Sequence, residues 1–181
     1  MTPTPIAKSA LRENDIYHIG LVAAEWNYAE TIVQLVIWTL AGIDHSRGRI
    51  ITTHTTTVIN ADMARTLANE LLVDQIVLRD EILDVLKSFD SLRIKRNTIV
   101  HAYWVPKSNP EWDDLPEYAF AKARGELKVG THSLDEDFIR VTVGEITGLI
   151  GRLTKVLRQL PQCPIFKAIE ITSITADQGT A

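Results

Sequence analysis

The stretch Arg96-Asn97-Thr98-Ile99-Val100-His101-Ala102-Tyr103-Trp104 closes the most regular apolar pattern of the chain. Upstream of it, from about Ile76, apolar residues recur at steps of three and four, which is the spacing of one helix face. These residues are Ile82, Val85, Leu86, Phe89, Leu92, Ile99, Val100 and Tyr103. The pattern predicts a long helix over about 77–104.

A positive charge lies inside this apolar face. At about 100° per residue, Arg96 falls within the apolar arc, whereas Asn97 and His101, four residues apart, share one edge of it. A guanidinium keeps its charge, and burying it without a partner is very costly. Arg96 therefore requires either an acidic partner or a cleft or subunit interface that binds phosphate. Glu25 and Glu30, beside the apolar stripe of an earlier helix, are the candidate acidic partners.

These residue types suit cleavage of an RNA phosphodiester. Without a metal, the reaction needs the 2′-hydroxyl as nucleophile, a base beside it, an acid at the leaving 5′-oxygen and a cation on the phosphate. Arg96 could hold the phosphate in two hydrogen bonds, and Asn97 could orient the histidine or bond a phosphate oxygen. His101 could transfer the proton, because histidines titrate near neutral pH. Tyr103 could stack on a base.

The motif Arg96-Asn97-x-x-x-His101-x-Tyr103 resembles the signature of the HEPN superfamily. These are small helical proteins with an R-x4-6-H motif near the end of a long helix, and many are metal-independent endoribonucleases that act as dimers. They occur in toxin–antitoxin, antiviral and RNA-processing systems. The motif covers eight of 181 residues, and the helical layout extends the resemblance to roughly Ile16–Leu160.

The resemblance implies a function and a set of partners. The expected protein is a homodimer that cleaves single-stranded RNA with Arg96, Asn97 and His101, without a cofactor or metal. Lys95 and Tyr103 are the expected RNA-binding residues, and a cognate antitoxin or defence protein is the expected partner. In one toxin–antitoxin branch a nucleotidyltransferase attaches AMP to the position of Tyr103. The segment 107–131 and the longer chain depart from that branch.

Two other interpretations stay open at this stage. In the first, Arg96 pairs with Glu25 or Glu30 in an inert core, and Asn97 and His101 bond across helices. In the second, the protein is a non-catalytic HEPN-like module for dimerisation or for binding RNA or nucleotides.

The remaining pattern predicts an all-α fold, an antiparallel bundle of about four long helices. The helices are expected at about Arg12–Ala41, Arg49–Leu72, 77–104 and 134–160. The second of them includes the β-branched run Ile50–Ile59, whose propensity alone would favour a strand. Loop residues at 107–116 and two short strands after them predict a small hairpin-like insertion before the last helix.

The predicted domain organisation is a flexible arm at 1–11, a HEPN-like helical domain at 12–160 that contains the insertion 107–131, and a tail at 161–181. In the tail, Ile165 and Phe166 are the residues that could pack back on the domain.

Composition limits the class of protein. The chain has a net charge of −4 and 45% hydrophobic residues, which is typical of an ordinary globular domain and not of a nucleic-acid coat protein. Cys163 is its one cysteine, so an intramolecular disulfide is excluded and a reducing cytoplasm is expected. No signal peptide is visible, and the apolar segment Ile32–Ile43 is too short for a membrane span.

Motifs for other chemistries are missing from the sequence. The histidines show no H-E-x-x-H spacing and no pairing with cysteine, so no metal site is expected. The glycine-rich signatures of nucleotide hydrolysis and dinucleotide binding and the nucleophile elbow of hydrolases are also missing.

Overall fold

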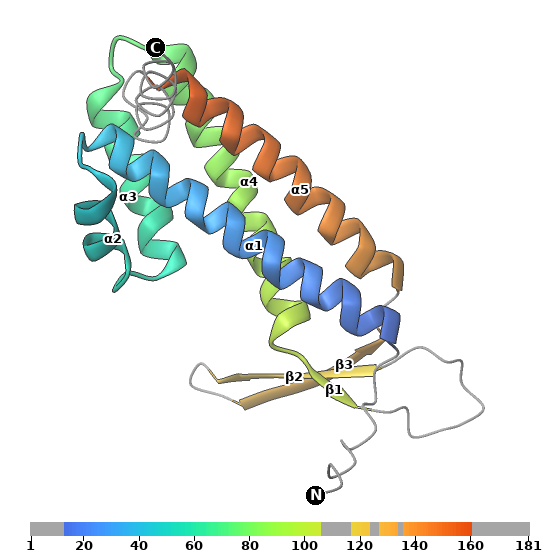
Figure 1. Ribbon diagram of the computed structural model, residues 1–181. Coiled ribbons are helices and arrows are strands. Elements are labelled where there is room, and N and C mark those ends of the chain that lie inside the picture. The colour runs from blue at the N-terminus through green and yellow to red at the C-terminus, as the bar shows by residue number, and fades with distance from the viewer. Residues whose placement is uncertain (1–12, 106–116, 124–126, 134–135, 161–181) are drawn as a thin grey trace, which may run out of the picture. The chain divides into compact units, whose positions relative to one another are not determined.

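The computed structural model describes residues 13–105, 117–123, 127–133 and 136–160, and helices make up most of them (Figure 1). The prediction of an all-α protein is confirmed at this level. The five helices of this part are α1 (Glu13–Leu40), α2 (His45–Thr52), α3 (Thr57–Leu71), α4 (Ile76–Val100) and α5 (Glu136–Gln159). The strands are β1 (Tyr103–Val105), β2 (Glu117–Ala123) and β3 (Leu127–Ser133). The predicted arm at 1–11 and tail at 161–181 lie outside the described residues.

The chain divides into two compact units. The first takes Met1–Glu25 and Leu92–Ile146, and the second takes Trp26–Ser91 and Thr147–Ala181. The first unit therefore contains the start of α1, the end of α4, the three strands and the start of α5. The second contains the rest of α1, α4 and α5 together with α2 and α3.

In the first unit the strands form one antiparallel sheet with β2 in the centre. Tyr103 in β1 pairs with Ala119 in β2, and Phe120 in β2 pairs with Gly130 in β3. The prediction that the motif helix continues to Trp104 is wrong, because α4 ends at Val100 and Tyr103 begins a strand. Aromatic and β-branched residues favour strands, and the proline at 106 disfavours helical geometry in the residue before it.

In the second unit a buried aromatic pair joins α1 to α4. Trp26 is only 1% exposed and stacks on Phe89, with ring centroids 4.5 Å apart. The Nε1 of Trp26 donates to Oε1 of Glu30 at 2.6 Å, and the hydroxyl of Thr57 donates to the same oxygen. The carboxylate of Glu30 therefore links α1 to the first turn of α3.

Ion pairs join α4 to α5 and α3 to α4 in the same unit. Arg152 in α5 contacts Asp84 at 2.5 Å, and Lys155 contacts Glu81 at 2.6 Å. The hydrogen bond from Lys155 is the main cause that lowers the pKa of Glu81 below its ordinary value. Arg65 in α3 pairs with Asp90 in α4. Charged residues thus flank the apolar contacts between these helices.

The prediction of one continuous helix over Arg49–Leu72 is wrong, because α2 ends at Thr52 and α3 begins at Thr57. The hydroxyl of Thr53 donates to the carbonyl of Arg49 at 2.6 Å, and that of Thr56 accepts from the backbone N–H of Ile59 as the N-cap of α3. The Thr53 hydroxyl adds a second bond to a carbonyl that already accepts the Thr53 N–H, and the Thr56 hydroxyl satisfies an N–H at the start of α3, so threonines support both sides of the break.

The connection between α1 and α2 is shorter than the sequence predicts. Gly42 lies just after the end of α1, and its positive φ of 65° suits glycine. The residues from His45 to Gly48, expected in a loop, instead begin α2. The side chain of Asp44 caps this helix by accepting from the backbone N–H of Ser46 and Arg47 at 2.9 and 3.0 Å. These bonds lower the pKa of Asp44, with that from Arg47 the largest cause.

Gly48 fixes α2 against the buried indole of Trp38. A Cβ added at Gly48 would lie 2.5–2.7 Å from three ring carbons of Trp38, so we expect Gly48→Ala to destabilise the fold by about 1–3 kcal/mol. The matched control is Gly148→Ala in α5, where a Cβ meets no atom within 4 Å and should stabilise by about 0.5–1 kcal/mol. Urea unfolding of both variants measures the difference. Equal effects at the two glycines would contradict the packing of α2 on Trp38.

Candidate functional site

The last turn of α4 positions the polar motif in the first unit. Ile99 is fully buried and anchors this turn, whereas Arg96 and Asn97 are half-buried and His101 is exposed. The backbone N–H of His101 still donates to the carbonyl of Asn97 at 3.1 Å, although His101 follows the helix. The end of α4 thus holds two motif residues on the helix and the third just beyond it.

The structure brings the side chains of Arg96, Asn97 and His101 together. Nη1 of Arg96 lies 3.0 Å from Oδ1 of Asn97 and 2.9 Å from Nε2 of His101. A guanidinium can only donate hydrogen bonds. The contact with His101 therefore requires a neutral imidazole whose Nε2 accepts and whose Nδ1 carries the proton.

Arg96 has polar neighbours but no charge partner in this unit. Among the described residues of the unit, no carboxylate pairs with its guanidinium, whose side-chain hydrogen bonds are those with Asn97 and His101. Its Nε is buried and has no hydrogen-bond partner there. An unneutralised, partly desolvated guanidinium with free donor capacity is suited to binding an anion such as a phosphate.

Lys95, predicted as an RNA contact, is neutralised in the structure. Its Nζ lies 2.8 and 2.7 Å from the two carboxylate oxygens of Glu145 on α5. Both side chains are more than a third exposed, so this pair contributes little to stability. The sequence pattern did not single out Glu145, because nothing local marks a partner 50 positions away.

The two predicted acidic supports occupy different units. Glu25 is half-buried at the end of the α1 segment in the first unit. Glu30 belongs to the second unit, where its carboxylate accepts from Trp26 and Thr57. Arg96 and Glu30 belong to different units, so their pairing stays a prediction.

Tyr103 lies apart from the helical motif. It begins β1 and pairs through its backbone with Ala119 of β2, in a sheet and not on the last turn of α4. The helical spacing that placed Tyr103 on the same face as Val100 is therefore wrong for this residue.

The described residues contain neither a metal-binding cluster nor a membrane-spanning helix. No group of three or more histidine, cysteine, aspartate or glutamate side chains in this part is arranged to hold a metal ion. Of the helices that the structure describes, none has the length and apolar content to cross a lipid bilayer.

Known proteins offer no guide to this chain. No family model, no curated protein and no solved structure matches it. A functional assignment therefore depends on the chemistry of the cluster formed by Arg96, Asn97 and His101.

Proposed function

We propose that this protein is a HEPN-like, metal-independent endoribonuclease that acts as a homodimer in a toxin–antitoxin or antiviral setting. The observation that carries the proposal is the 2.9 Å contact between Nη1 of Arg96 and Nε2 of His101, in a unit whose described residues give Arg96 no carboxylate. We also propose that the helices pack as an antiparallel bundle of about four long helices, with a hairpin-like insertion before the last one.

In the proposed reaction, the ribose 2′-oxygen attacks phosphorus while the bond from phosphorus to the 5′-oxygen breaks. The products are a 2′,3′-cyclic phosphate and a 5′-hydroxyl. Arg96 binds the phosphate and stabilises its developing charge, and Asn97 helps to orient His101. His101 moves one proton, either from the 2′-hydroxyl or to the leaving oxygen. A twofold dimer with two motifs at one cleft would supply the second histidine.

The contact between Arg96 and His101 gives this site a resting state. The lone pair on Nε2 of His101 accepts from Arg96, so it cannot accept a substrate proton at the same time. A phosphate that draws the guanidinium to itself would free Nε2. The movement of the Arg96 guanidinium onto the phosphate would then both bind the substrate and free His101 to act as a base.

Lys95 and Tyr103 have secondary parts in the proposal. Lys95 would reach RNA only after leaving Glu145, and because the pair is exposed, this exchange has a low free-energy cost. Tyr103 would contact RNA or accept a modification from a cognate partner.

Two observations favour the alternative of a non-catalytic HEPN-like module. The lone pair of His101 is occupied, and Lys95 is neutralised by Glu145. A protein in this state could bind RNA, a nucleotide or a partner protein through Arg96 without cutting.

The deciding experiment is an RNA cleavage assay in EDTA. The purified protein, free of any native partner, is incubated with single-stranded RNA, and the ends of the products are identified by mass spectrometry. We expect cleavage that leaves 2′,3′-cyclic phosphate ends, because the mechanism uses no metal. Intact RNA, whether bound or unbound, would refute the enzyme and favour the module.

A further inference from the structure

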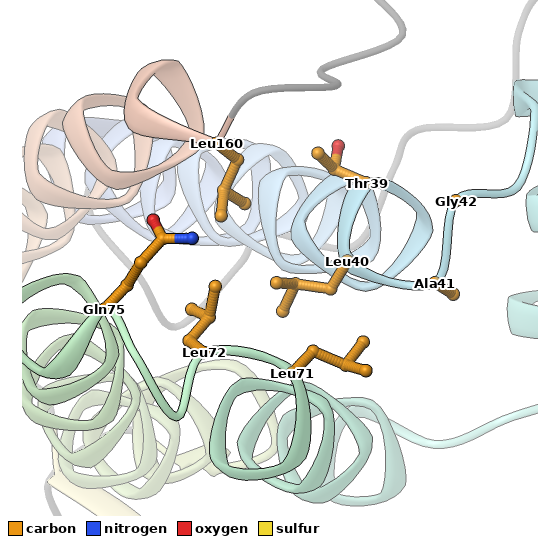
Figure 2. A pocket seen from close by; sticks show the side chains of 8 residues that line it. All are labelled: Thr39, Leu40, Ala41, Gly42, Leu71, Leu72, Gln75 and Leu160. Carbon is orange, nitrogen blue, oxygen red and sulfur yellow. The ribbon is translucent and has the colours of Figure 1, made fainter.

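A small apolar pocket lies in the second unit where three helices end and one begins (Figure 2). Its volume is about 290 Å³. The side chains of Leu40, Leu72, Leu160 and Gln75 converge on its centre, and they come from α1, the two ends of the α3–α4 connection and the residue after α5. Aliphatic side chains therefore form most of the wall.

The surface beside this pocket is unusually apolar. Leu71, Val73 and Ile76 are 52%, 59% and 56% exposed, all within six consecutive residues. Single exposed aliphatic residues are ordinary, but several close together in sequence, beginning at the pocket residue Leu71, are typical of a site where another apolar group binds. These residues make this end of the unit a candidate docking surface.

The size and polarity of the pocket select the kind of occupant. A cavity of about 150 Å³ holds benzene, so 290 Å³ accommodates one aromatic ring and one aliphatic side chain. Known pockets for drug-sized ligands span about 300–1,000 Å³, which places this one at their lower limit. These features fit an uncharged apolar peptide.

The chain itself supplies such a peptide at this place. Leu160, the last residue of the structure's described part, is a wall of the pocket. It is followed by Pro161-Gln162-Cys163-Pro164-Ile165-Phe166, which carries no charge and ends in a branched aliphatic residue and an aromatic one. Six residues reach up to about 20 Å when extended, which is ample for a return to the pocket. The prolines carry no N–H that burial would leave unsatisfied.

We propose that Ile165 and Phe166 bind in this pocket and cover the apolar surface at the α3–α4 connection. This inference is independent of the ribonuclease proposal, since it depends on other residues and on a different unit.

The single native cysteine allows a direct test by disulfide trapping in the full chain. Gln75→Cys places a thiol at the pocket, and Val77→Cys is the matched control, two residues away in a separate groove lined by Glu81, Lys155 and Arg158. Mild oxidation should link Cys163 to position 75 at least about tenfold faster than to position 77, because docking raises the local concentration of the thiol. Peptide mass spectrometry after non-reducing electrophoresis identifies the bond.

The docking residues are tested in the same assay. Adding Phe166→Ser to Gln75→Cys should lower the rate to that of the Val77→Cys control. Leu71→Cys, also at the pocket, replaces Gln75→Cys if that variant does not fold. Equal rates at the pocket and at position 77, no effect of Phe166→Ser, or disulfides only between two chains would each overturn the proposal.

Discussion

Replacing His101 by alanine should lower the rate of RNA cleavage by about 10²–10⁴-fold, the usual contribution of one proton-transfer group. The fold should not change, because the imidazole is exposed and its side-chain contact is the hydrogen bond from Arg96. We expect the free energy of unfolding to stay within about 0.5 kcal/mol of the wild type. Single-turnover cleavage in EDTA and urea unfolding on the same preparation measure the two quantities. Cleavage at the wild-type rate by this variant would remove His101 from the mechanism.

Variants of Arg96 separate phosphate binding from structure. Arg96→Ala should reduce cleavage at least as much as His101→Ala, because it removes the cation from the phosphate. Arg96→Lys is the matched control, since it keeps the charge but loses the two-pronged donor geometry. If Arg96 instead pairs with a buried carboxylate, Arg96→Ala should cost about 3–5 kcal/mol of stability. A large loss of stability would therefore favour the inert-core interpretation, and a large loss of cleavage with a normal melting temperature would favour the enzyme.

The long helices could be predicted from the sequence because their signal is local. Apolar residues at three- and four-residue steps gave α1 and most of α4 within a few residues of their ends. The break between α2 and α3 could not be predicted from the sequence, because it depends on which hydrogen bonds the threonine hydroxyls of residues 52–56 make. Tyr103 lies in a strand because its backbone pairs with Ala119, 16 positions further along the chain. The apolar periodicity of α4 contains no information about that pairing.

The residues of the candidate site could be predicted from the sequence, but the contacts between their side chains could not. Spacing along one helix was enough to group Arg96, Asn97 and His101. His101 directly follows α4 and keeps the helical backbone bond to Asn97, but its Nε2 lies 2.9 Å from Nη1 of Arg96, a contact that spacing alone does not predict. The neutralisation of Lys95 by Glu145 joins α4 to α5 and has no local signal in the sequence.

The largest loss of stability is expected for Trp26→Ala in the second unit. Trp26 is 1% exposed, its ring stacks on Phe89 and its Nε1 donates to Glu30. Truncation removes a large apolar surface, opens a cavity and takes one of two donors from the Glu30 carboxylate, so the cost should be about 3–5 kcal/mol. For a chain of this size that lowers the melting temperature by roughly 6–20 °C.

The control for this prediction lies two residues further along α1. Tyr28 is also aromatic but 54% exposed, and Tyr28→Ala should change stability by no more than about 0.5 kcal/mol. Trp26→Phe separates the two contributions, because it keeps an aromatic ring against Phe89 and loses the bond to Glu30. If Trp26→Ala melts like Tyr28→Ala, the aromatic pair is not part of the core. If Trp26→Phe is as damaging as Trp26→Ala, the hydrogen bond to Glu30 and the lost volume outweigh ring stacking in joining α1 to α4.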